Sequence, residues 1–324
     1  MPSLRDHDQA SLFANLYCDA DLVAPELITP DEKVLVRERC RGTRDGIVDC
    51  HCFDLPDFIA DAGGLDMGSK IITGTSPKIQ ERITVVPSEC FDWPPDLIPG
   101  DIVGINLKDI LSHKPTSRWG HYTLSEDVHI DLSALSRPVF AGKRVVLFCS
   151  YIDVAIEKLW WLRSKISLYE EIASGGFYAV SGMNFSLFLH ECPLGHLINI
   201  NKSLLFTKEL SDLGVPIIPH VYAVNESQRK KWIAYLQENP SVKTVVINTQ
   251  LQRDRYSMTE VTRTVEALLD NTDTSIILNG FKPHNLQRGL DSRVFMANQR
   301  GLKRQAIIAK ARGLNLSAPS AVST

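Results

Sequence analysis

The chain of 324 residues is long enough for two domains, or for one barrel-sized domain with an added segment. Its hydrophobic content of 44% and charged content of 23% are ordinary for a globular protein with a large core. A net charge of -3 excludes a global electrostatic attraction to nucleic acid or to an anionic membrane, so any nucleic-acid surface must be local. The charged N-terminus and the lack of a long apolar run predict a cytoplasmic protein with no membrane partner.

Residues 1–140 are punctuated by proline and glycine and show little amphipathic periodicity. They predict an irregular N-terminal segment with strand candidates at residues 81–86 and 101–105. One or two strands from this segment could complete a barrel formed by the rest of the chain.

Five of the seven cysteines lie in the same segment, and thiolates are soft ligands that suit zinc or an iron-sulfur cluster. The candidate metal ligands are Cys40, Cys50, Cys52 and Cys90. One residue separates Cys50 from Cys52, whereas about two to four separate the paired ligands of structural zinc sites. Buried thiols are the default interpretation, so we expect no cofactor, with a metal site as the alternative.

From residue 141 to residue 314, short apolar runs alternate with helical patterns. Strands are expected within residues 143–150, 177–188, 217–223, 243–251, 274–280 and 293–298, and helices at 152–174, 197–213, 225–239, 257–271 and 300–314. Asn225 with Gln228, and Ser257 with Glu260, resemble capping boxes at two helix starts. The small, polar tail, residues 315–324, is expected to be disordered.

This alternation predicts an α/β fold with a (βα)6 core at residues 141–314. Its parallel sheet would form a complete or partial TIM-like barrel, because right-handed crossovers make that arrangement self-consistent. The carboxyl ends of parallel strands form a common rim, where polar residues distant in sequence would gather.

Amide side chains predominate at the expected strand ends, and each offers a paired donor and acceptor that can bind the edge of a base, an amide or a sugar. We therefore expect a small polar ligand or nucleic acid as the partner. The candidate ligand-binding residues are Asp153, Asn184, Tyr222, Asn248, Gln250, Asn279 and Lys282.

Three residues are candidates for acid-base or nucleophilic chemistry at this rim: His220, His284 and Asp291. Each has a plain alternative, since His220 could bond a backbone group within its strand and the other two could be turn residues. Basic residues that could contact nucleic-acid phosphates are Arg300, Lys303 and Arg304, and a solvated helix face is the alternative.

Two resemblances arise from these segments. The run VVLFCSYIDVAIEKLWW, followed by Asn184-Phe185-Ser186-Leu187, resembles an uncharacterised family of phages and mobile elements over residues 145–280. Members of that family have an Asp-Phe-Ser-Leu element, and Asn184 stands in place of its Asp. The resemblance implies a phage or mobile-element context and no particular activity.

A weaker resemblance is to tRNA-guanine transglycosylase-like barrels, which have a Ser-Gly-Gly-Phe segment preceded by a catalytic Asp. Ser174-Gly175-Gly176-Phe177 and the later Asp291-Ser292 are similar in order, although Ala173 replaces the first acid. This resemblance implies that Asp291 would be the nucleophile of a base exchange.

Two classes of function remain open. One is an α/β-barrel-like enzyme that acts on a nucleobase, nucleotide or nucleic acid, including glycosyl or base exchange as a transferase. The other is a non-catalytic, nucleic-acid-associated binding or interaction protein of a mobile element. Neither the substrate nor the oligomeric state follows from the sequence.

Overall fold

The computed structural model describes residues 59–311, apart from 115, 119–120, 124, 126, 188–192, 251–254 and 281–290. Several residues named above therefore lie outside the described residues: Cys40, Cys50, Cys52, Lys282, His284 and the tail 315–324.

Eight parallel strands form one sheet in the order β7-β6-β5-β2-β1-β10-β9-β8. Neighbouring strands in the sheet are consecutive parallel strands of the chain, and the first strand, β1, pairs with the last, β10. The strands are β1 (Ile83–Val85), β2 (Ile102–Asn106), β5 (Arg144–Phe148), β6 (Ala179–Ser181), β7 (Ile217–Ile218), β8 (Thr244–Asn248), β9 (Ser275–Asn279) and β10 (Val294–Asn298). A parallel bridge between His220 and Val246 joins the two edge strands. The fold is thus a nearly closed, TIM-like α/β barrel, as the alternating pattern predicted.

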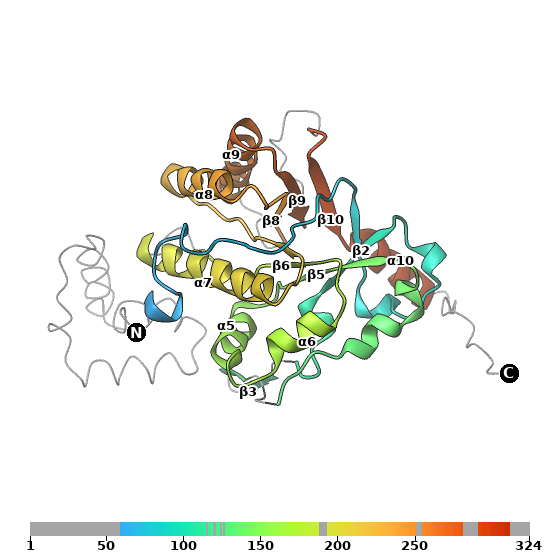
Figure 1. Cartoon of the computed structure of the whole chain (residues 1–324). Coiled ribbons are helices and arrows are strands. Elements are labelled where there is room, and N and C mark those ends of the chain that lie inside the picture. The colour runs from blue at the N-terminus through green and yellow to red at the C-terminus, as the bar shows by residue number, and fades with distance from the viewer. Residues whose placement is uncertain are drawn as a thin grey trace, which may run out of the picture.

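Helices connect β5 to β6, β6 to β7, β7 to β8 and β8 to β9, and a last helix follows β10 (Figure 1). They are α5 (Asp153–Leu162), α6 (Leu168–Ser174), α7 (Pro193–Asp212), α8 (Glu226–Glu238), α9 (Arg255–Asn271) and α10 (Arg300–Ala311). Short 3₁₀ turns are η2 (Ser88–Cys90), η3 (Pro95–Leu97), η4 (Leu107–Asp109), η5 (Leu132–Ser136) and η6 (Pro138–Phe140), and β3 (Thr116–Arg118) pairs with β4 (His121–Thr123) as a hairpin. Among the helices of the described residues, none has the length and hydrophobicity that a membrane crossing requires.

The helix boundaries correct two predictions. The single helix expected at residues 152–174 is two helices, and Arg163 caps the first by donating to the carbonyl of Trp160 at 2.7 Å. The cap at Asn225 is confirmed, because its Oδ1 accepts from the backbone N–H of Gln228 at 2.9 Å. Ser257 is not an N-cap, since α9 already begins at Arg255.

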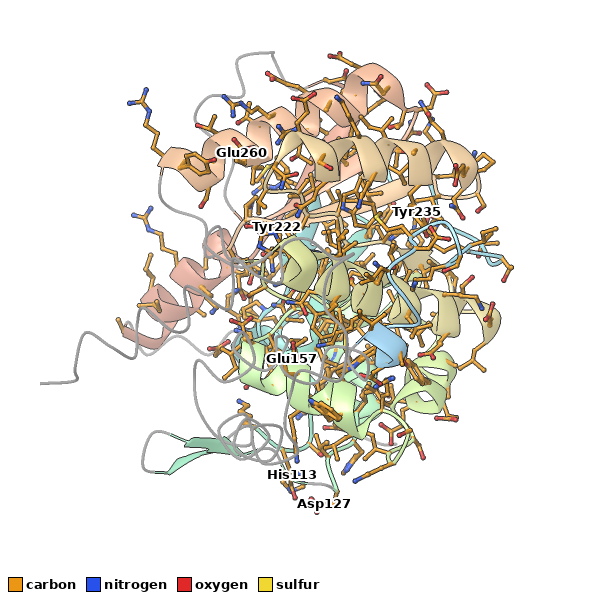
Figure 2. The ribbon with its side chains drawn as sticks, turned by 90° about the vertical axis from the view of Figure 1, so that its left-hand side faces the viewer. His113, Asp127, Glu157, Tyr222, Tyr235 and Glu260 are labelled. Atoms are coloured by element: carbon orange, nitrogen blue, oxygen red, sulfur yellow. The ribbon has the colours of Figure 1, made fainter. Side chains whose placement is uncertain are left out.

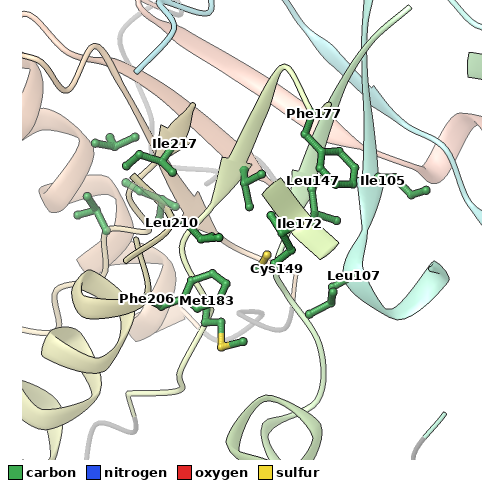
Figure 3. Close-up of a cluster of buried hydrophobic side chains, with 14 of the residues drawn as sticks. Ile105, Leu107, Leu147, Cys149, Ile172, Phe177, Met183, Phe206, Leu210 and Ile217 are labelled. Atoms are coloured by element: carbon green, nitrogen blue, oxygen red, sulfur yellow. The ribbon is translucent and has the colours of Figure 1, made fainter. Parts of the chain in front are cut away.

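Two apolar layers hold the barrel together. The inner layer fills the barrel with alternate side chains of the strands, among them Ile83, Val85, Ile102, Val146 and Phe148. The outer layer joins the strands to the helices, and Figure 3 shows part of it, with Leu147 and Ile217 of the sheet near Ile172, Phe206 and Leu210 of the helices. Met183, in the segment after β6, belongs to the same cluster.

A buried ion pair lies within the outer layer, between α5 and α7. Lys202 Nζ is 2.6 Å from Glu157 Oε2, and the side chains are only 3% and 9% exposed. Lys202 Nζ also lies 4.4 Å from the ring centroid of Phe185, and Figure 2 shows Glu157 on α5. Removing one partner alone would leave an uncompensated buried charge, which typically costs about 3–5 kcal/mol.

The segment that precedes β1 closes the N-terminal end of the barrel. Ile79 is fully buried in the inner layer, and its N–H donates to Thr244 Oγ1 at 3.0 Å. The same hydroxyl donates to the carbonyl of Pro77 at 2.7 Å. The C-terminal ends of the strands are therefore the end at which polar groups can meet a ligand.

We predict that Gly104→Ala destabilises the fold. A Cβ at Gly104 would lie 2.6 Å from Phe148 Cε2 and 3.1 Å from Val85 Cγ2, inside the barrel. Such overpacking costs about 1–3 kcal/mol, measurable as a lower midpoint of urea unfolding. The matched control is Gly301→Ala, where a Cβ meets no atom within 4 Å and should be neutral or slightly stabilising. Equal stability of the two variants would contradict this account.

Candidate functional site

The mouth of the barrel, defined as the C-terminal ends of its eight strands, is lined by polar side chains. Alternation along the strands turns Asn106, His220, Asn248 and Asn279 inward, because Ile102, Ile218, Val246 and Ile277 of the same strands lie in the inner layer. In barrels of this type the mouth is where active sites are found. The gathering of strand-end amides expected from the sequence is therefore present.

Hydrogen bonds tie these amides together across the mouth. Asn248 Nδ2 donates to Ser150 Oγ at 3.3 Å, which links β8 to the end of β5. Asn248 Oδ1 accepts from the N–H of Gln250 at 3.0 Å, and Gln250 Nε2 donates to Asn279 Oδ1 at 3.2 Å. Three of the predicted ligand-binding residues thus form one network.

Gly280 allows this network to form. Its φ of +129° lies in a region that side chains disfavour, and a Cβ there would lie 2.7 Å from the backbone nitrogen of Gln250. Only glycine permits the turn after β8 to approach the end of β9 so closely.

Four buried polar atoms at the mouth have no hydrogen-bond partner within the described part of the chain. They are Asn106 Oδ1, His220 Nε2, Asn279 Nδ2 and Gln299 Oε1. Asn106 and Asn279 are each 1% exposed as whole residues, and His220 is 4% exposed. An unpaired buried polar group costs about 1–3 kcal/mol, so such a set calls for a partner that supplies the missing bonds.

His220 is uncharged in this environment. Burial lowers the pKa of its imidazole from 6.5 to about 3, because the cation would lose its hydration. At neutral pH the ring can donate or accept a hydrogen bond, but it cannot serve as a cationic proton donor.

Asp109 is a carboxyl at the mouth that the strand pattern of the sequence did not predict. It ends η4, directly after β2, and its Oδ2 accepts from Asn106 Nδ2 at 3.4 Å. Burial is the main cause that raises the pKa of this carboxyl. The sequence does place three polar residues in the run Asn-Leu-Lys-Asp, directly after the strand candidate at 101–105. This run could have indicated a residue at the mouth, but it lies in a region without clear periodicity.

Three other predicted ligand residues follow strands but lie outside the amide network. Asp153 begins α5 and accepts a hydrogen bond from Ser186 Oγ, and half-buried Asn184 donates its backbone N–H to the carbonyl of Cys149 at 3.1 Å. Tyr222 lines a cavity of about 10 Å³ beside Glu260 of α9, room for about one water molecule (Figure 2). This cavity lies between β8 and α9, outside the barrel interior.

Asp291 does not join the mouth, which corrects its prediction as a catalytic residue. It precedes β10, and its carboxylate pairs with Arg293, whose guanidinium donates to the carbonyls of Thr272 and Leu269 before β9. Because all the strands are parallel, this position is at the N-terminal end of the barrel. Gly175 and Gly176 lie at that end too, between α6 and β6.

The basic residues predicted to contact nucleic acid belong to α10, which begins at Arg300. Arg304 is exposed, whereas Lys303 is half-buried and its charge acts on Asp109. Cys90 is fully buried, and burial raises the pKa of its thiol to about 11, which disfavours the thiolate that a metal needs. Within the described ranges, no group of three or more His, Cys, Asp or Glu residues could hold a metal ion.

Comparison with known proteins identifies no family. No family model matches the sequence, and no curated protein does. Solved structures that the comparison matched include an oxaloacetate acetylhydrolase, at 11% identity and a TM-score of 0.34, covering 76% of this chain and 86% of that chain. A D-allulose 3-epimerase from Methylomonas sp. in complex with D-allulose gives 14% identity and a TM-score of 0.36, covering 69% and 85%.

An endo-beta-N-acetylglucosaminidase from Cordyceps militaris gives 12% identity and a TM-score of 0.33, covering 75% of this chain and 85% of that chain. At these values the activities of the three proteins do not carry over to this chain.

We predict that His220 makes the protein less stable as the pH falls. The unfolded chain binds a proton at His220 near pH 6.5, whereas the folded chain binds it only near pH 3, so acid between these values favours unfolding. Over the two pH units below 6.5, this amounts to about 2 kcal/mol of unfolding free energy. His220→Gln should remove that part of the pH dependence in urea titrations at pH 6.5, 5.5 and 4.5. If the unfolding free energies of the two proteins fall equally with decreasing pH, the prediction is wrong.

Proposed function

We propose that the protein is a barrel enzyme that acts on a nucleobase, nucleotide or nucleic acid held at the mouth. The observation that carries the proposal is the set of buried, unpaired polar atoms there. Asn106 Oδ1 and Gln299 Oε1 can only accept hydrogen bonds, whereas Asn279 Nδ2 can only donate them. A complementary ligand must present both donors and acceptors, as the edge of a base does.

The charge of the site supports a neutral ligand group over a fully ionised one. His220 is uncharged, and the network of Asn248, Gln250 and Asn279 contains only amides. Buried amides select a ligand by hydrogen bonding, because an analogue that lacks the matching group leaves them unpaired. Glycosyl or base exchange is one reaction class compatible with such recognition.

A non-catalytic binding protein is the second candidate, and two observations favour it. Asp291 lies at the far end of the barrel, and His220 is neutral at physiological pH. If the mouth only holds its ligand, bases or nucleosides will bind without chemical change. The likeness of Asn184-Phe185-Ser186-Leu187 to a phage and mobile-element family stays a prediction in either case.

Ligand binding can be measured by thermal unfolding of the full chain with adenine, guanine, cytosine and uracil, their nucleosides and their 5′-monophosphates. Glucose and N-acetylglucosamine represent the competing sugar class. A ligand present at 100 times its Kd should raise Tm by about 5 °C, since binding stabilises the native state by about 3 kcal/mol. Stabilisation by a sugar and by none of the bases, nucleosides or nucleotides would overturn the proposal.

Asn279→Leu should weaken the affinity for the stabilising ligand about 10-fold, because it removes the unpaired donor while keeping a side chain of similar size. Isothermal titration calorimetry provides the Kd. The matched control is Asn271→Leu, an exposed amide at the end of α9, which should leave the Kd unchanged. Equal affinities of the Asn279 variant and the control would place the ligand elsewhere.

A further inference from the structure

A second polar group lies at the mouth on the side formed by β10, β1, β2 and β5. Its centre is Asp109, which follows β2. Lys108 of η4, Glu89 of η2 and Lys303 of α10 act on its charge, and Asp109 in turn acts on Tyr151, which follows β5. Four consecutive units of the barrel therefore bring titratable groups to one carboxyl.

Asn106 connects this carboxyl to the interior of the mouth. Its Nδ2 donates to Asp109 Oδ2 at 3.4 Å, while its Oδ1 is fully buried and has no partner among the described residues. The amide can therefore hold Asp109 with one end and contact a ligand with the other. A ligand bonded to Asn106 Oδ1 would lie next to the Asp109 carboxyl.

The surroundings of Asp109 favour its protonated form. Burial raises its pKa and so does Glu89, whereas Lys108, Asn106 and Lys303 act in the opposite direction. Burial and the Asp109 charge also raise the pKa of Tyr151. A raised carboxyl pKa brings Asp109 closer to the pH range in which a general acid works.

We propose that Asp109 is the acid-base group of the mouth and that Asn106 positions its carboxyl. This inference rests on the proposed function. In the acid direction the Asp109 O–H bond breaks, its electron pair stays on the carboxylate, and the proton bonds to a basic nitrogen or oxygen of the ligand. In the base direction the same proton returns. Neutral His220 then only forms hydrogen bonds to the ligand. Proton transfer takes place on the Asp109 side of the mouth, and ligand recognition takes place on the His220 side.

The first test needs no ligand. In protein labelled with ¹³C at aspartate side-chain carboxyls, the Asp109 resonance is assigned by its loss in Asp109→Asn and then titrated. Its midpoint should lie above the ordinary aspartate value of about 3.9. Asn106→Leu and Lys303→Met should each raise it further, by about half a pH unit or more, because each removes a group that favours the carboxylate. A midpoint at or below the ordinary value, or one that Asn106→Leu leaves unchanged, overturns the proposal.

The second test measures turnover. Adenosine, guanosine, cytidine and uridine are incubated with the protein, and release of free base or any altered nucleoside is followed by chromatography. Asp109→Asn should retain nucleoside affinity within about 3-fold and lower the rate by about 100-fold or more, and the remaining rate should lose its dependence on the Asp109 titration. The control, Asp273→Asn, changes an exposed carboxyl at the N-terminal end of β9 and should retain full activity.

The outcomes separate the two proposals. Unchanged turnover in Asp109→Asn overturns the role of Asp109 and leaves the proposed function standing. If no base, nucleoside or nucleotide binds the unmutated chain, the proposed function fails. The carboxyl titration alone then decides whether the pKa of Asp109 is raised, as the acid-base role requires. Binding without turnover in the unmutated chain overturns the acid-base role and supports the non-catalytic candidate.

Discussion

Closure of the parallel barrel is the constraint on which the rest of the structure depends. It is completed between β7 and β8, where the N–H of Val221 donates to the carbonyl of Val246 at 2.8 Å and the N–H of Val246 donates to the carbonyl of Pro219 at 3.0 Å. Pro219 lacks a backbone N–H donor, but its carbonyl still accepts, so the residues that follow the two-residue strand β7 can pair with β8. Because every strand runs in the same direction, eight strand ends meet at one mouth.

Burial then determines the chemistry of that mouth. Removing water disfavours charge on any side chain, so the same physical cause has opposite effects on an acid and on a base. It lowers the pKa of His220 and raises the pKa of Asp109, which leaves both groups uncharged over a wider range of pH than in water. The amides between them are neutral at every pH. A mouth of this kind binds through the direction of its hydrogen bonds more than through net charge.

Periodicity explains how much the sequence could predict. Strands after residue 141 are continuous apolar runs, so the barrel and the meeting of Asn248, Gln250 and Asn279 followed from strand direction alone. Asp109 was missed because it lies in a 3₁₀ turn just after the strand candidate at 101–105, and such a short turn leaves little periodic signal. Asp291 was misplaced because a polar residue that precedes a parallel strand lies at the opposite end from one that follows it.

The close approach at Gly280 has a consequence for the thermodynamics of recognition. There the main chain, with a φ of +129°, fixes the distance between the ends of β8 and β9, so Gln250 and Asn279 are already oriented toward each other before any ligand arrives. Groups that are ordered in advance do not lose rotational freedom on association. The backbone geometry of one turn therefore contributes to ligand selectivity. The entropy lost in ordering these amides is lost during folding and not during binding.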